Sequence, residues 1–152
     1  MLLKAIDNEL AEIRHEGVEG NPHVFPDRDS FVEVFVKLTK PGMQWSVTDP
    51  CLMVYEIQQI IKWLRGVALK KQAMEPLYFM EPNLSFHFLY YEDDSTYFKI
   101  GFSAELSPPW ASEACYYMYF QTTDEEIESL ASGLKKELDG VYQHVMTGRI
   151  WN

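Results

Sequence analysis

The hydrophobic pattern is clearest between Pro76 and Glu105, where two alternating runs flank an acidic turn. The apolar even positions of the first run are Met80, Pro82, Leu84, Phe86, Phe88 and Tyr90, and those of the second are Phe98, Ile100, Phe102 and Ala104. Alternation with a period of two and many aromatic rings predicts half-buried antiparallel strands over 80–90 and 97–105. A slip of one residue would turn every apolar side chain to water, so even positions must oppose even positions. This predicts Tyr90 opposite Phe98 and Phe86 opposite Phe102, around a turn at 93–95.

The segment before this hairpin predicts two strands and a helix. Residues 31–38, FVEVFVKL, are β-branched and aromatic, and residues 43–47 return after a Pro-Gly turn. Asp49 followed by Pro50 is a typical helix start, which predicts a helix over 50–70. Its predicted buried stripe is Met53, Ile57, Ile60, Leu64 and Val67, and its predicted wet side includes Glu56.

The segment after the hairpin predicts a third strand and a second helix. Residues 116–120, YYMYF, follow a Ser-Pro-Pro-Trp break that ends the preceding strand. Thr123 with Glu126 three residues later forms a capping box, which predicts a helix over 124–143. The tail MTGRIWN either folds back or stays loose.

The first residues allow two interpretations. Positions 3, 6, 10 and 13 are apolar with helical spacing, but residues 10–15 would also suit an edge strand. Gly, Pro, Asn and Asp dominate residues 17–30 and predict a loop. The pattern as a whole predicts a single α+β domain over 1–152: an antiparallel sheet in the order ββ-α-βββ-α, with the two main helices packed against it.

Charge narrows the class of partner. The formal net charge is −10, which disfavours nucleic acid because phosphate contacts need a basic patch. Residues 76–120 hold one base, Lys99, against six acids: Glu81, Glu92, Asp93, Asp94, Glu105 and Glu113. No apolar run approaches the roughly 20 residues of a membrane span. This acidity fits a basic protein partner, or simply keeps the protein soluble, and we expect no membrane association.

Little in the sequence indicates catalysis. The histidines lack Cys, Asp or Glu partners at zinc-site spacing, and no cofactor-binding motif occurs, so we expect neither metal nor cofactor. Cys51, at the expected helix start, is the one candidate nucleophile, although a buried structural thiol is the simpler interpretation. A second enzymatic hypothesis uses the pair Glu81 and Glu105. Without a complete catalytic set, a binding protein is favoured over a small enzyme, with a peptide-binding regulatory module as a further alternative.

Seven residues are candidates for partner binding. Glu81 and Glu105 lie at strand ends on the polar face, with Asn83 across from Glu105 in the predicted register; they either bind a ligand or bond neighbouring backbone. Glu92, Asp93 and Asp94 form the hairpin tip, which suits a basic partner. Trp110 is either a lid on the core or an exposed anchor.

Three segments, taken in order, resemble the WapI family of bacterial immunity proteins. They are the helix CL…E…WL over 51–64, the strand FMEPNLSF over 79–86, and the strand end ELSPP over 105–109. The resemblance covers roughly residues 30–145. It implies a cytoplasmic antidote that binds and neutralises the toxin domain of a contact-dependent polymorphic toxin, such as a WapA-type tRNA-cleaving nuclease. It also implies an N-terminal strand near residues 10–15, and it supplies no catalytic residues.

Overall fold

A computed structural model describes residues 1–18, 30–69 and 75–151. Most of the loop predicted over 17–30, and the predicted helix end at Lys70, lie outside this range. Four antiparallel strands, in spatial order β1-β2-β3-β4, form one sheet: β1 (Leu2–Lys4), β2 (Leu10–Val18), β3 (Phe31–Lys40) and β4 (Met43–Met53). Three more form a second sheet: β5 (Leu84–Glu92), β6 (Ser95–Ser103) and β7 (Cys115–Thr123).

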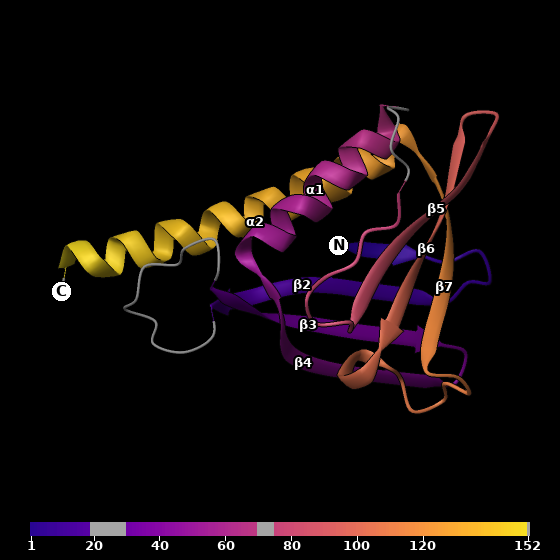
Figure 1. The fold of residues 1–152 in the computed structure, drawn as a ribbon, viewed down its shortest axis with the longest axis horizontal. Coiled ribbons are helices and arrows are strands. Elements are labelled where there is room, and N and C mark those ends of the chain that lie inside the picture. The colour runs from indigo at the N-terminus through magenta and orange to yellow at the C-terminus, as the bar shows by residue number, and fades with distance from the viewer. Residues whose placement is uncertain (19–29, 70–74, 152) are drawn as a thin grey trace.

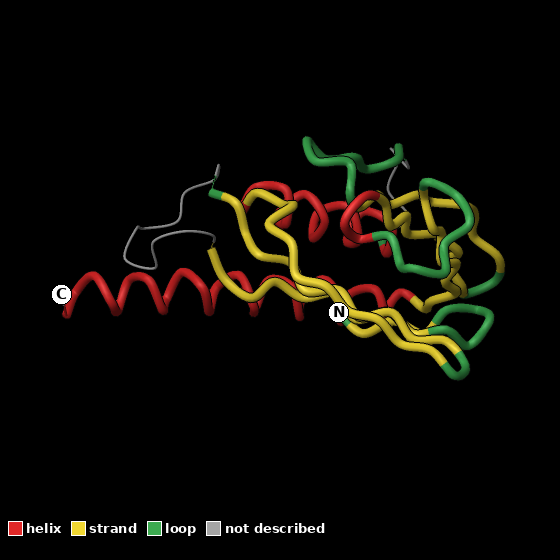
Figure 2. The backbone as a smooth tube through the Cα atoms, turned by 90° about the horizontal axis from the view of Figure 1, so that it is seen from below, coloured by secondary structure: helices red, strands yellow, loops and turns green. Residues whose placement is uncertain are grey.

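Two helices complete the α+β fold that the sequence predicts. These are α1 (Val54–Ala68) and α2 (Asp124–Trp151), and a short 3-10 turn, η1 (Ala104–Leu106), follows β6. Figure 1 shows the helices side by side over the four-stranded sheet, with the three-stranded sheet crossing at a steep angle at one end. Both sheets and both helices contribute to one hydrophobic core. In Figure 2 the C-terminal part of α2 extends past the ends of the strands.

The N-terminal residues are strands rather than a helix. β2 pairs with β3 along its length, and β1 pairs with β2 through Leu3 and Ala11. This resolves the two interpretations of residues 1–16 in favour of the strand near residues 10–15. Alternate side chains of β2 enter the core, namely Ala11, Ile13 and His15. The element order is therefore ββββ-α-βββ-α.

The predicted helix start at Asp49 and Pro50 is wrong. β4 continues to Met53 because Leu52 and Met53 still pair with β3, and α1 begins at Val54. The register shift between Val32 and Val34 lies opposite Pro50, and β4 is the last strand of the sheet. A bulged edge strand tolerates proline, which has no N–H to donate.

The predicted register of the central hairpin is also wrong. β5 begins at Leu84, so Met80 lies outside the strand and is exposed. Phe86 pairs with Ile100, two residues away from the prediction. The turn contains only two residues, Asp93 and Asp94, because Glu92 pairs with Ser95, and Asp93 takes a positive φ of 54°. Short hairpin turns favour such a conformation, which Asp tolerates.

A bulge in β5 changes which side chains face outward. Phe88 pairs with Phe98, but Tyr90 pairs with Tyr97, so the register shifts between Phe88 and Tyr90. Neighbouring residues of a strand point to opposite faces, so Tyr97 points away from the core that Phe98 fills. Tyr90, predicted to face the core, therefore lies on the outer face.

The second helix begins as predicted and ends later. The Glu126 N–H donates to Thr123 Oγ1 at 3.2 Å, and the Thr123 hydroxyl bonds the Glu126 carboxylate. Ile127, Leu134 and Leu138 are buried. The helix continues to Trp151 instead of ending near residue 143, so the tail neither folds back nor leaves the helix.

Candidate partner-binding surface

The acidic hairpin tip is an exposed turn. Glu92, Asp93 and Asp94 are all exposed, at the turn that joins β5 and β6. The tip projects away from the helices, as the sequence predicts for a turn between two strands (Figure 1). All three carboxylates of the tip are therefore available to a partner.

A face rich in tyrosine continues from this tip across the three-stranded sheet. We call it the outer tyrosine face; it consists of three cross-strand rows, Ser85–Gly101–Tyr117, His87–Lys99–Tyr119 and Tyr90–Tyr97–Gln121. Tyr90 and Tyr119 are each 47% exposed, and Tyr117 is 37% exposed. The opposite face of the same strands carries buried Phe86, Phe98 and Phe120.

The rings on this face contact one another. Tyr90 stacks on Tyr97 with centroids 4.4 Å apart and an interplanar angle of 15°. The Lys99 ammonium lies 4.1 Å from the centroid of Tyr117 and 5.9 Å from that of Tyr119. His87 contacts Tyr117 edge-on at 5.6 Å. The pKa of His87 is lowered, first by burial and then by Lys99.

Sequence analysis missed the outer tyrosine face. The alternation in residues 116–120 puts Tyr117 and Tyr119 on the other side of the strand from Met118 and Phe120. This signal was sufficient to predict half of the outer tyrosine face. The other half depends on the β5 bulge, which the alternation of apolar residues does not reveal.

Asn83 is a structural residue rather than a free ligand group. It is 2% exposed, and its Nδ2 donates to Glu105 Oε2 at 2.8 Å and to Asp49 Oδ2 at 3.2 Å. Its carbonyl accepts from the Ser103 N–H at 2.9 Å. The predicted proximity of Asn83 and Glu105 therefore exists, through η1 rather than strand pairing. It joins the start of β5 to the end of β6 and to β4.

Glu56 is buried, contrary to the prediction that it faces water. Its side chain accepts from the Met53 N–H and the Met80 N–H, both at 2.9 Å. One carboxylate therefore caps α1 and holds the segment before β5. Glu81, next to Met80, is exposed.

Cys51 lacks the surroundings of an activated nucleophile. It is 1% exposed, and its pKa is raised to about 12, first by burial and then by the negative charge of Asp49. A reactive cysteine needs the opposite shift.

Trp110 is half-buried and packs against the core, which matches the lid interpretation more closely than the exposed anchor. Its ring contacts Tyr116 edge-on at 6.3 Å, and the Lys40 ammonium lies 5.1 Å from its centroid.

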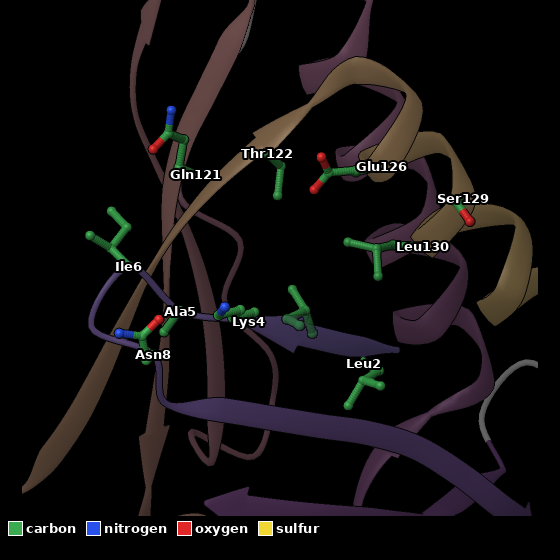
Figure 3. Close-up of a pocket in the computed structure, with 11 residues that line it drawn as sticks. Leu2, Lys4, Ala5, Ile6, Asn8, Gln121, Thr122, Glu126, Ser129 and Leu130 are labelled. Carbon is green, nitrogen blue, oxygen red and sulfur yellow. The ribbon is translucent and has the colours of Figure 1, made fainter. Parts of the chain in front are cut away.

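A hollow of about 500 Å³ lies between β1, β7 and α2. Figure 3 shows Glu126 and Leu130 extending from α2 toward it, with Leu2 and Lys4 on the β1 side. Leu2 and Ile6 are largely exposed at its rim. The hollow is open to solvent and brings none of the seven predicted site residues together.

The described residues hold neither a metal-binding cluster nor a membrane-spanning helix. No cluster of three or more His, Cys, Asp or Glu residues in ranges 1–18, 30–69 and 75–151 is placed to hold a metal ion. No helix in the same ranges is both long and apolar enough to cross a membrane.

Comparison with known proteins identifies a family. No curated protein and no solved structure matches the chain. The family model described as the immunity protein WapI-like family matches residues 3–141, which include both sheets, α1 and most of α2. The chain belongs to the WapI-like immunity protein family.

Proposed function

We propose that this protein is a cytoplasmic immunity protein that binds and neutralises the toxin domain of a polymorphic contact-dependent toxin. Its membership of an immunity protein family, over residues 3–141, carries the proposal. Binding alone suffices for such a role, since a bound protein blocks a toxin by covering its active surface.

The charge of the molecule supports a basic partner. A net charge of −10 attracts a positively charged domain from a distance and speeds its capture. The exposed tip, Glu92 to Asp94, adds a local concentration of negative charge. Complementary charge raises association rates more than it lowers dissociation rates.

The alternative enzymatic hypotheses gain no support from the geometry. Cys51 is buried with a raised pKa. Glu105 is engaged by Asn83, while Glu81 lies exposed beyond the start of β5. The negative charges near Cys51, which include Asp49 and Glu105, disfavour the thiolate that a nucleophile needs.

The test starts from the genes beside that of this chain: where one encodes a large secreted protein, its C-terminal domain is the candidate toxin. Expressed alone in bacteria, that domain should arrest growth; co-expressed with this chain, it should not. The two purified proteins should form a complex in size-exclusion chromatography and calorimetry. Failure to bind, combined with turnover of a small substrate by this chain, would overturn the proposal.

A further inference from the structure

We infer that the outer tyrosine face is the surface that docks on the basic toxin domain, with the stacked Tyr90 and Tyr97 receiving an arginine side chain. This inference rests on the proposed function and deepens it. It names a face that sequence analysis did not find.

The exposure of the rings points to a partner. Tyr90, Tyr117 and Tyr119 each leave more than a third of their surface in water, on one continuous side of a sheet. Tyrosine is enriched in protein interfaces because its rigid ring supplies contact area at low entropic cost and its hydroxyl bonds the partner. A sheet face needed only for solubility would carry charged and small polar side chains in these rows.

The β5 bulge places Tyr90 on this face. Without it, Tyr90 would continue the inward series of Leu84, Phe86 and Phe88. With it, Tyr90 stacks on Tyr97, and Tyr91 turns in to donate to the Val67 carbonyl at 2.9 Å. Bulges commonly re-aim side chains at functional surfaces.

Charge divides the face into two ends and selects the occupant. From the middle row toward one end, Lys99 already covers Tyr117 and Tyr119. At the other, Glu92 projects from the same side of β5 one row beyond Tyr90, beside the acidic turn. The pKa of Tyr97 is raised, first by desolvation and then by Glu92, Tyr90 and Asp93, so its surroundings are negative.

An open aromatic pair beside carboxylates suits a guanidinium. Arginine stacks flat on an aromatic ring and donates to a carboxylate from its edge at the same time. The lysine ammonium is a compact charge without a flat face, so it stacks less well on an aromatic ring. Lys99, 4.1 Å from the centroid of Tyr117, shows that a cation already lies against another tyrosine ring of this face.

The experiment measures binding of the C-terminal toxin domain named above to variants of the full chain. Tyr90→Ala and Tyr97→Ala should each weaken binding about tenfold or more, mainly through faster dissociation. Tyr97→Phe keeps the ring and should stay within about threefold of wild type. Tyr55→Ala, on α1, is the matched control and should bind as wild type does. Circular dichroism and thermal unfolding establish that each variant is folded.

The arginine is tested by double-mutant cycles. Each surface arginine of the toxin domain is replaced by lysine and combined with Tyr97→Ala. One arginine should be coupled to Tyr97. Replacing it should weaken binding to the wild-type chain about tenfold, but should weaken binding to the Tyr97→Ala variant little. Absence of coupling to every arginine would overturn the assigned occupant.

The remaining outcomes separate the two proposals. If wild type binds the toxin domain and Tyr90→Ala and Tyr97→Ala bind equally well, the interface lies elsewhere, while the proposed function stands. If wild type forms dimers in sedimentation analysis that Tyr97→Ala dissociates, the face belongs to a second copy and the inference is wrong. If wild type does not bind the toxin domain, the proposed function fails and the inference with it.

Discussion

Gly101 shows how closely the outer tyrosine face is packed at the scale of single residues. A Cβ added there would lie 2.6 Å from Ser85 Oγ, 2.8 Å from Cys115 Sγ and 3.0 Å from Tyr117 Cε1. Neighbouring side chains therefore fill the space that a side chain of Gly101 would occupy in the first row of the face. Alternation alone counted Gly101 as an ordinary polar-face residue.

Gly101→Ala should destabilise the fold by about 1–3 kcal/mol, because three side chains must move to admit one methyl group. Urea unfolding followed by fluorescence measures the loss. Gly133→Ala is the matched control: nothing lies within 4 Å of its added Cβ, and it sits on the exposed side of α2. It should stabilise by about 0.5–1 kcal/mol, since alanine favours the helix. Equal effects at both positions would contradict the packing argument.

Asn83 gives a second prediction at this scale, because its amide donates to two carboxylates. Asn83→Asp replaces the donor by a third acceptor between Asp49 and Glu105, and should cost about 2–4 kcal/mol at neutral pH through repulsion and lost bonds. Lowering the pH should recover part of this, since protonation removes the repulsion. Chemical unfolding at pH 7 and pH 5 measures both effects.

Glu81→Ala is the control for Asn83→Asp. Glu81 lies two residues away and is exposed, so its replacement should change stability by less than about 0.5 kcal/mol. A large effect of Glu81→Ala with none at Asn83 would reverse the roles that the structure gives these residues.

Elements differed in how far the sequence could predict them. The stripe of Ile57, Ile60 and Leu64 identified α1, and the capping box of Thr123 identified the start of α2. The spacing of apolar residues along a helix shows which side of it is buried. It does so whichever elements pack against that side, so a local pattern was sufficient here. The start of α1 was wrong because pairing of β4 with β3, a tertiary contact, outweighed the local signal of Asp49 and Pro50.

The tip of the β5–β6 hairpin carries the prediction at element scale. Reversing Asp93 and Asp94 to lysine should slow association with the toxin domain several-fold at low salt and little at high salt. At about 0.1 M salt the field of an exposed charge reaches only about 10 Å. Stopped-flow association rates across a salt series make the measurement.

Unfolding of the tip variant should match wild type, because exposed turn charges contribute little stability. An unchanged rate at low salt would place the steering charge elsewhere.

At the scale of the whole molecule, β2 and α2 are joined through a buried histidine. The ring nitrogen Nε2 of His15 lies 3.5 Å from Glu137 Oε2. The backbone N–H of His15 donates to the same oxygen at 3.5 Å. The pKa of His15 is lowered, chiefly by burial, while Glu137 opposes the shift. The fold therefore favours the neutral ring.

A histidine whose pKa is lower in the folded state stabilises the protein fully above its ordinary value of 6.5. That stability is lost as the pH falls below 6.5 toward the folded pKa. Between pH 7.5 and pH 5.5, wild type should therefore lose more stability than His15→Gln, whose side chain does not titrate. Urea unfolding at both pH values tests this, and equal losses would mean that His15 is not the responsible group.

The seven candidate residues separate by the information that each required. Glu92 to Asp94 were correctly expected at an exposed tip, because turn composition and strand alternation are local. Asn83 and Glu105 were correctly expected near each other, but the partner Asp49 comes from another sheet and no local pattern indicates it. Trp110 needed knowledge of the surface beneath it, which only the assembled core supplies.

The hydrogen bonds that tie the first residues of the chain to β7 and α2 have a consequence for the order of events during synthesis. Tyr116 donates to Glu9 across 107 residues, the Ile6 N–H bonds the Tyr119 carbonyl, and His15 reaches α2 across 122 residues. A chain still emerging from the ribosome contains β1 and β2 but not yet the whole of β7 and α2. The contacts of the first residues with β7 and α2 therefore form only when synthesis is nearly complete. We expect folding to be a single late event, slowed by the long loops that must close. For a member of an immunity protein family, this means that only copies completed before exposure to a toxin can act, which favours keeping a standing reserve over making the protein on demand.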